Sequence, residues 1–131
     1  MIRRRDAMRR GVPVLVAVAG AIGLGACRQA ALYESSGGQF PGTGSLADRE
    51  ALIRRAIASQ PGWTVQPMGP ALLRAANGWN DHQMTVDIAF DIRSFSIRYV
   101  SSVNLDYDGA RIHQAYNQRV QALESAILRG G

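Results

Sequence analysis

The sequence is short of the residues from which most catalytic and metal sites are built. Its 131 residues include no lysine and one cysteine, Cys27, and the two histidines, His82 and His113, lie far apart. A single cysteine excludes an intramolecular disulfide and a metal site made of several thiolates. There is no Gly-rich phosphate loop, no Gly-x-Ser-x-Gly nucleophile motif and no pair of carboxylates with catalytic spacing. The sequence therefore predicts no catalytic residues, no metal and no cofactor.

Positive charge is concentrated at the amino terminus. The formal net charge is +5, but residues 1–26 hold five of the fifteen arginines and one of the ten acidic residues. The rest of the chain, with ten arginines and nine acidic residues, is close to neutral. A basic chain would otherwise suggest nucleic-acid binding. We expect no nucleic-acid partner.

The first 26 residues have the organisation of an export signal. Five of the first ten residues are arginines. Residues 11–26 carry no charge, and residues 12–19 are mainly apolar. The uncharged stretch is shorter than the roughly 20 strongly apolar residues that a membrane-spanning helix needs. The pattern predicts a cleaved signal peptide over residues 1–26 rather than a permanent transmembrane anchor.

The end of this signal, Leu24-Gly25-Ala26-Cys27, resembles the lipobox of bacterial lipoproteins, in which small residues precede an obligatory cysteine. The resemblance implies cleavage between Ala26 and Cys27 and lipidation of the Cys27 thiol, so that the membrane is a partner through a lipid anchor. Arg28 stands where inner-membrane lipoproteins carry Asp, which implies the periplasmic face of the outer membrane, with the inner membrane as the alternative. The other interpretation of Cys27 is a buried cysteine in an apolar helix.

The stretch after the cysteine has the composition of a linker. Residues 28–44 are rich in Ser, Gly and Pro and include Ser35-Ser36-Gly37-Gly38. Such a composition is typical of a flexible coil, with an end-to-end distance of roughly 20–25 Å over this length. We expect residues 27–44 to be the lipidated cysteine and a flexible linker, and residues 45–131 to form one small domain.

A helix is predicted over residues 46–59. Ser45 and Asp48 have the spacing of a capping box, and Pro61-Gly62 ends the pattern. The apolar residues Leu46, Leu52, Ile53, Ala56 and Ile57 form one stripe. Arg49, Glu50, Arg54 and Arg55 are expected on the solvent face.

Strands are predicted next. A short strand covers residues 63–66, and residues 71–76 are ambiguous between strand and helix; strand is favoured because Asn77-Gly78 is typical of a hairpin turn. Residues 83–90 and 95–103 alternate in hydropathy and fold back across residues 91–94. In that register Phe90 faces Phe95, Ile88 faces Ile97, Val86 faces Tyr99, and Asp87 forms an exposed ion pair with Arg98.

The chain closes with a second predicted helix. Apolar residues recur at helical spacing over residues 110–128, at Ile112, Tyr116, Val120, Leu123 and Ile127. The predicted order is helix, three or four antiparallel strands, helix. With one apolar sheet face, this is an α+β fold in which both helices pack on that face as a two-layer sandwich.

The junction before the last helix carries a second resemblance. Residues 101–107, Ser-Ser-Val-Asn-Leu-Asp-Tyr, followed by Ile112-His113 and Tyr116-Asn117, are similar to a group of small uncharacterised exported lipoproteins of Gram-negative bacteria. The similarity covers residues 45–128. It implies no activity, because none is assigned to that group.

The same junction is the best candidate site, formed by Asp106, Asp108, His113, Tyr116 and Asn117. A histidine with acidic neighbours can shuttle protons or bind a metal. The favoured interpretation is structural: Asp108 caps the helix, and His113 and Asn117 bond backbone carbonyls. His82 is expected in a solvated loop.

Two functions remain open. The favoured one is a non-enzymatic envelope lipoprotein that binds a protein, peptidoglycan or lipid partner, which predicts an apolar or aromatic patch around Trp63 and Trp79. The alternative is a small hydrolase, or a metal- or ligand-binding protein, centred on His113.

Overall fold

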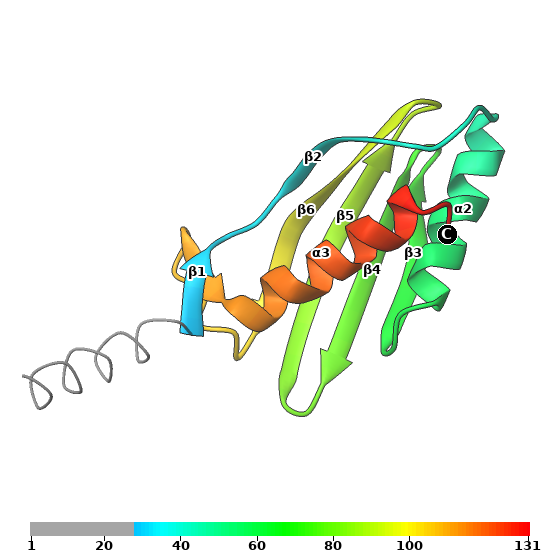
Figure 1. Ribbon diagram of the computed structural model, residues 1–131. Helices are drawn as coiled ribbons and strands as arrows, with labels where there is room; N and C mark the ends of the chain where they lie inside the picture. The colour runs from blue at the N-terminus through cyan, green and yellow to red at the C-terminus, as the bar shows by residue number, and fades with distance from the viewer. Residues whose placement is uncertain (1–27) are drawn as a thin grey trace, which may run out of the picture.

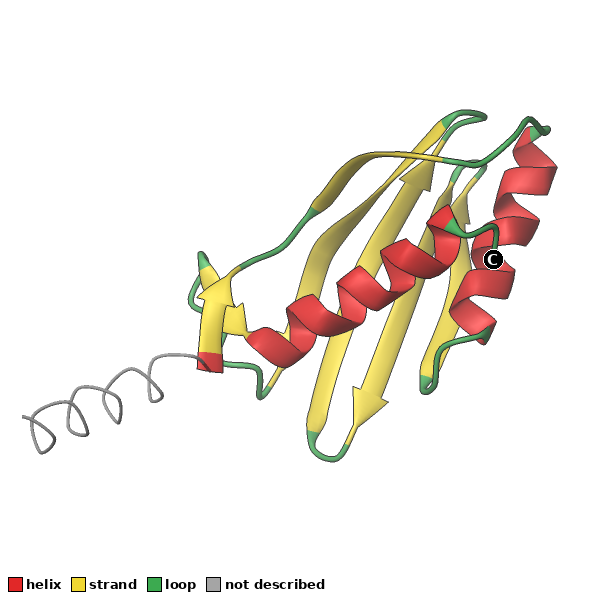
Figure 2. Ribbon diagram, in the orientation of Figure 1, coloured by secondary structure: helices red, strands yellow, loops and turns green. Residues whose placement is uncertain are grey.

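The computed structural model describes residues 28–131 (Figure 1). The predicted signal peptide, its cleavage site and Cys27 lie outside the described residues. The fold is α+β, as predicted. Two helices lie on one side of a five-stranded antiparallel sheet, and a two-stranded sheet stands at one end of the molecule (Figure 2).

The helix–strands–helix order is only partly matched, because three further strands flank the predicted elements. The bounds are β1 Gln29–Ala31, β2 Ser35–Gln39, α2 Leu46–Ala58, β3 Trp63–Gly69, β4 Leu72–Trp79, β5 His82–Phe90, β6 Ser94–Val103, β7 Arg111–His113 and α3 Gln114–Leu128. The large sheet has the order β2-β6-β5-β4-β3, and β1 pairs with β7.

The prediction of a flexible linker is wrong for residues 29–39, which form β1 and β2. Asn117 fixes the connection between them: its Nδ2 donates to the carbonyl of Ala31 at 2.8 Å, and its Oδ1 accepts from the backbone N–H of Tyr33 at 2.9 Å. The Tyr33 hydroxyl donates to Glu124 at 2.6 Å, and the Ser35 hydroxyl donates to the other oxygen of the same carboxylate. Side chains of α3 therefore hold this segment in place.

Glycine in β2 serves close packing. A Cβ atom built on Gly38 would lie 2.6 Å from the ring of Phe95 on the neighbouring strand β6. Real Cβ atoms essentially never approach another carbon so closely, so any larger residue here would require the buried ring of Phe95 or the backbone of β2 to shift. The same residue type is typical of linkers, which is why composition alone led to the wrong prediction.

Helix α2 confirms the capping box, since Ser45 and Asp48 each accept from the other's backbone N–H. Arg49, however, was expected in solvent and is 4% exposed. Its Nε donates to the carbonyl of Ile92 at 2.8 Å, and its Nη atoms donate to the carbonyls of Pro41 at 3.1 Å and Gly42 at 2.9 Å. This arginine binds two loops to α2.

Strand β4 confirms the strand favoured at 71–76, but the predicted turn at Asn77-Gly78 is wrong. Both residues lie inside β4, and the chain reverses at residues 80–81, where Asn80 has a φ of 52°. Asn77 is buried, and its Nδ2 donates to the carbonyl of Pro61 at 2.9 Å. The amide thus holds the loop between α2 and β3.

The hairpin of β5 and β6 has the predicted register: Phe90 pairs with Phe95, Ile88 with Ile97 and Val86 with Tyr99. A bulge follows between Thr85 and Val86. Beyond it the alternation shifts by one residue, and Val103 is 53% exposed.

The predicted ion pair of Asp87 with Arg98 is wrong, although the two residues are cross-strand partners. Arg74 is the partner of Asp87 on the other neighbouring strand, β4. Its Nε and Nη2 donate to the two carboxylate oxygens at 2.8 and 3.0 Å. A guanidinium that donates to both carboxylate oxygens forms a stronger pair than one that makes a single hydrogen bond.

Helix α3 begins at Gln114 rather than at residue 110, because residues 111–113 form β7 against β1. The predicted apolar stripe is confirmed, and all five residues are buried: Ile112, Tyr116, Val120, Leu123 and Ile127. Within residues 28–131, no helix has both the length and the hydropathy that crossing a membrane requires.

Candidate functional site

The two predicted acidic site residues lie in the exposed loop at residues 104–110. Asp108 was expected to cap α3, and it does not. Its Oδ1 accepts from the backbone N–H groups of Arg111 at 2.7 Å and Ala110 at 2.9 Å, and these bonds lower the pKa of the carboxyl. Asp106 has a φ of 55° and helps to turn the loop. Both residues shape the entry into β7.

His113 is the residue that caps α3. Its Nδ1 accepts from the backbone N–H of Ala115 at 3.0 Å, which requires the neutral ring to carry its proton on Nε2. The lone pair of Nδ1, the basic nitrogen of this ring, therefore already accepts a hydrogen bond. To act as a general base or metal ligand through Nδ1, His113 would have to release the helix cap.

The contacts of Tyr116 and Asn117 stabilise the fold and leave neither side chain free for chemistry. Tyr116 is fully buried and packs against Tyr99 at 5.6 Å between ring centroids, and its hydroxyl has no hydrogen-bond partner among residues 28–131. Burial raises the pKa of this hydroxyl, so the ring stays neutral. Asn117 bonds the carbonyl of Ala31, in agreement with its expected structural role.

The two histidines come together although they are distant in sequence. The His82 and His113 ring centroids lie 6.3 Å apart. His82 is half-buried rather than solvated, and its Nδ1 donates to the carbonyl of Asn104 at 2.7 Å. Within the described residues, no group of three or more His, Cys, Asp or Glu side chains is arranged to hold a metal ion.

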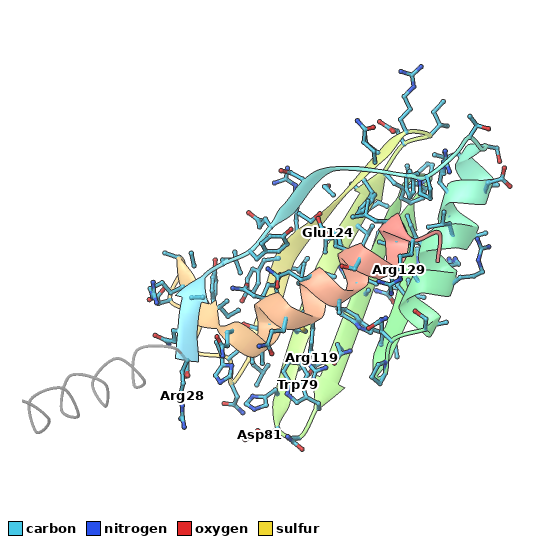
Figure 3. All side chains as sticks on the ribbon, in the orientation of Figure 1. Arg28, Trp79, Asp81, Arg119, Glu124 and Arg129 are labelled. Atoms are coloured by element: carbon cyan, nitrogen blue, oxygen red, sulfur yellow. The ribbon has the colours of Figure 1, made fainter. Side chains whose placement is uncertain are left out.

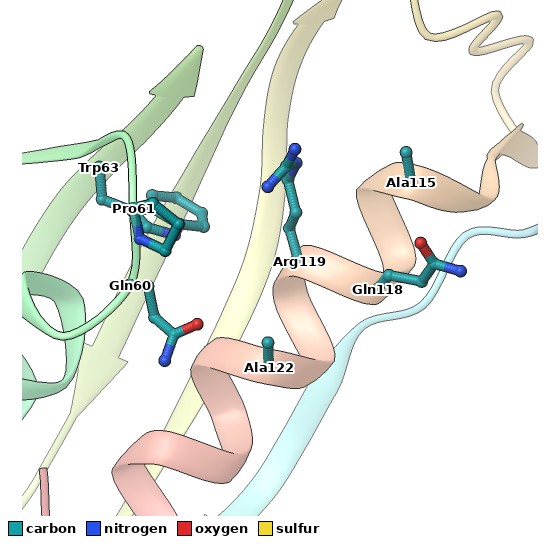
Figure 4. A pocket seen from close by; sticks show the side chains of 7 residues that line it. All are labelled: Gln60, Pro61, Trp63, Ala115, Gln118, Arg119 and Ala122. Carbon is teal, nitrogen blue, oxygen red and sulfur yellow. The ribbon is translucent and has the colours of Figure 1, made fainter. Parts of the chain in front are cut away.

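A different region has the geometry of a binding site. A pocket of about 280 Å³ opens between the loop that follows α2 and the outer side of α3 (Figure 4). Trp63 and Pro61 stand on one wall, and Arg119 rises from the helix on the other (Figure 4). The full lining is Gln60, Pro61, Trp63, Ala115, Gln118, Arg119 and Ala122.

Among the described residues, Arg119 is the only charged one that lines this pocket. Its guanidinium carbon lies 3.7 Å from the ring centroid of Trp79, so the cation stacks on the indole. Its Nε is buried without a hydrogen-bond partner, and no carboxylate of residues 28–131 lies within ion-pair distance of it. The indole of Trp79 thus positions the Arg119 guanidinium, and no carboxylate of residues 28–131 neutralises its charge.

Of the two tryptophans around which we expected a patch, Trp63 lines the pocket and Trp79 lies under its arginine. Arg119 itself was missed. The signal that could have found it is helical position, since residue 119 lies one turn from both Tyr116 and Leu123, at the border of the buried stripe. A cation at such a border covers apolar surface with its stem and places its head at the rim.

No family model matches the chain, and no curated protein is significantly similar to it.

Proposed function

We propose that this chain is the precursor of an exported lipoprotein whose domain is a non-enzymatic binding module of the bacterial cell envelope. The observation that carries the proposal is Leu24-Gly25-Ala26-Cys27, with the only cysteine of the chain at the end of an arginine-led apolar signal. Arg28 favours the periplasmic face of the outer membrane. The partner is an envelope protein or peptidoglycan.

Binding is favoured over catalysis by the state of the candidate side chains. The Nδ1 of His113 accepts a backbone hydrogen bond at the start of α3, and Asp108 accepts two in its own turn. Arg119, in contrast, is stacked but unpaired beside a pocket. The described residues that line this pocket include a cation but no acid, histidine or hydroxyl side chain that could act as a base or nucleophile. Such a lining suits recognition of an anion.

The fold also bears on how a lipid anchor would hold the domain. Strand β1 begins at Gln29, two residues after Cys27 in the sequence. β1 lies at the end of the molecule opposite α2 (Figure 1), and the Arg28 side chain is at the same end (Figure 3). A lipidated Cys27 would therefore keep the end formed by β1 and β7 against the membrane.

The test is lipid labelling in a Gram-negative host. Cells that express the full chain or its Cys27→Ala variant are grown with an alkyne-tagged fatty acid, and the protein is separated and examined for the tag. We expect the tag and membrane fractionation for the natural sequence, and neither for the variant. An untagged natural protein, or equal tagging of both, would overturn the lipid anchor.

A further inference from the structure

We infer that the pocket between the α2–β3 loop and α3 binds a small carboxylate ligand, with Arg119 as the group that recognises the charge. The inference names the ligand class of the binding module proposed above, but it does not depend on the lipid anchor. It rests on the unpaired guanidinium, the aromatic walls and the size of the pocket.

The first step is to compare Arg119 with two other arginines whose guanidinium groups have hydrogen-bond partners in the protein. Arg49 donates to three backbone carbonyls, and Arg74 donates to both carboxylate oxygens of Asp87. Arg119 makes no such bond within residues 28–131, and its guanidinium lies over the face of Trp79. Stacking engages the face of a guanidinium and leaves its in-plane donors free, and of these the Nη atoms, which unlike Nε are not buried, are available for an acceptor.

The second step is the charge of the ligand. Arg119 is the only charged side chain in the lining, so the pocket carries a single positive charge. One guanidinium matches one carboxylate in charge and in planar geometry, as Arg74 and Asp87 illustrate in the same protein. A doubly charged phosphate would leave one negative charge without a partner.

The third step is the body of the ligand. Trp63 and Pro61 offer a flat apolar wall, and the amides of Gln60 and Gln118 offer donors and acceptors. A volume of about 280 Å³ is at the small end of ligand pockets. This suits one sugar-acid ring or a dipeptide with a free carboxyl end, two sources of the same carboxylate chemistry.

Intrinsic fluorescence can report binding directly, because the chain has two tryptophans and both lie at Arg119 or in the pocket. The full chain carrying Cys27→Ala, which cannot be lipidated, is titrated with N-acetylmuramic acid and with acetyl-alanyl-alanine. The neutral counterparts are N-acetylglucosamine and acetyl-alanyl-alanine amide. We expect saturable quenching by at least one acid and none by its neutral counterpart.

The decisive variant is Arg119→Gln, with Arg129→Gln as the matched control because Arg129 is an exposed arginine at the end of the same helix. We expect Arg119→Gln to weaken binding on the order of tenfold or more and Arg129→Gln to leave it unchanged. Which acid binds identifies the source of the carboxylate. No quenching by either acid, equal quenching by the neutral compounds, or equal loss in both variants would overturn the inference, whether or not Cys27 is lipidated.

Discussion

Arg49 and Arg119 occupy similar surroundings and have opposite hydrogen-bonding states. Each cation lies over an aromatic ring, Arg49 at 4.8 Å from the ring centroid of Phe40 and Arg119 at 3.7 Å from that of Trp79. Arg49 donates to three carbonyls of two loops. Both arginines line a pocket, but Arg119 donates to no acceptor among residues 28–131.

The difference separates a structural arginine from one that is available to a ligand. Arg49 satisfies carbonyls of the loops that precede α2 and join β5 to β6, so removing it would leave several acceptors without donors. Removal of Arg119 would leave no protein acceptor unpaired. Because unsatisfied buried groups dominate the cost of polar substitutions, the two arginines should differ strongly in their effect on stability.

The largest effect is expected for Arg49→Ala. It removes a buried side chain and three hydrogen bonds, so we expect the free energy of unfolding to fall by about 3 kcal/mol or more. Urea unfolding of the full chain, monitored by far-ultraviolet circular dichroism, measures it. Arg54→Ala is the matched control, because its half-exposed pair with Glu50 is worth about 0.5 kcal/mol or less. Equal losses in the two variants would refute the structural role of Arg49.

Much of this fold follows from local sequence patterns. The capping box of Ser45 and Asp48 and the register of β5 with β6 were predictable, because both depend on residues close in sequence and on a strict period. β1 and β2 were not, because their positions depend on Asn117 and Glu124, which come from a distant helix. Composition gives no information about such partners.

The candidate site was predicted less well, for a related reason. Its residues gather at the correct end of α3, but each was assigned from its type rather than from its contacts. The cap is His113 and not Asp108, because β7 delays the start of the helix. Arg119 shows the converse: helical period places it beside the core, and only the packing of β4 brings Trp79 under its guanidinium.

A smaller effect with the opposite sign is expected for Tyr116→Phe. The Tyr116 hydroxyl is buried without a partner, so its removal should raise the free energy of unfolding by about 1 kcal/mol. Tyr99→Phe is the control, because the Tyr99 hydroxyl lies 2.8 Å from that of Ser102 and its loss should lower stability by about the same amount. The same urea experiment measures both. Destabilisation by Tyr116→Phe would show that the hydroxyl does have a partner in solution.

The smallest effect is expected for Arg119→Gln, and it tests the comparison most directly. The substitution removes the contact with Trp79, worth on the order of 1 kcal/mol, and also removes a buried donor that costs a similar amount while unpaired. The two contributions oppose each other, so the free energy of unfolding measured in urea should change by less than about 1 kcal/mol. A loss as large as that of Arg49→Ala would mean that Arg119 holds the fold together. A stable variant that no longer binds the carboxylate probe would show instead that the unpaired guanidinium serves the ligand.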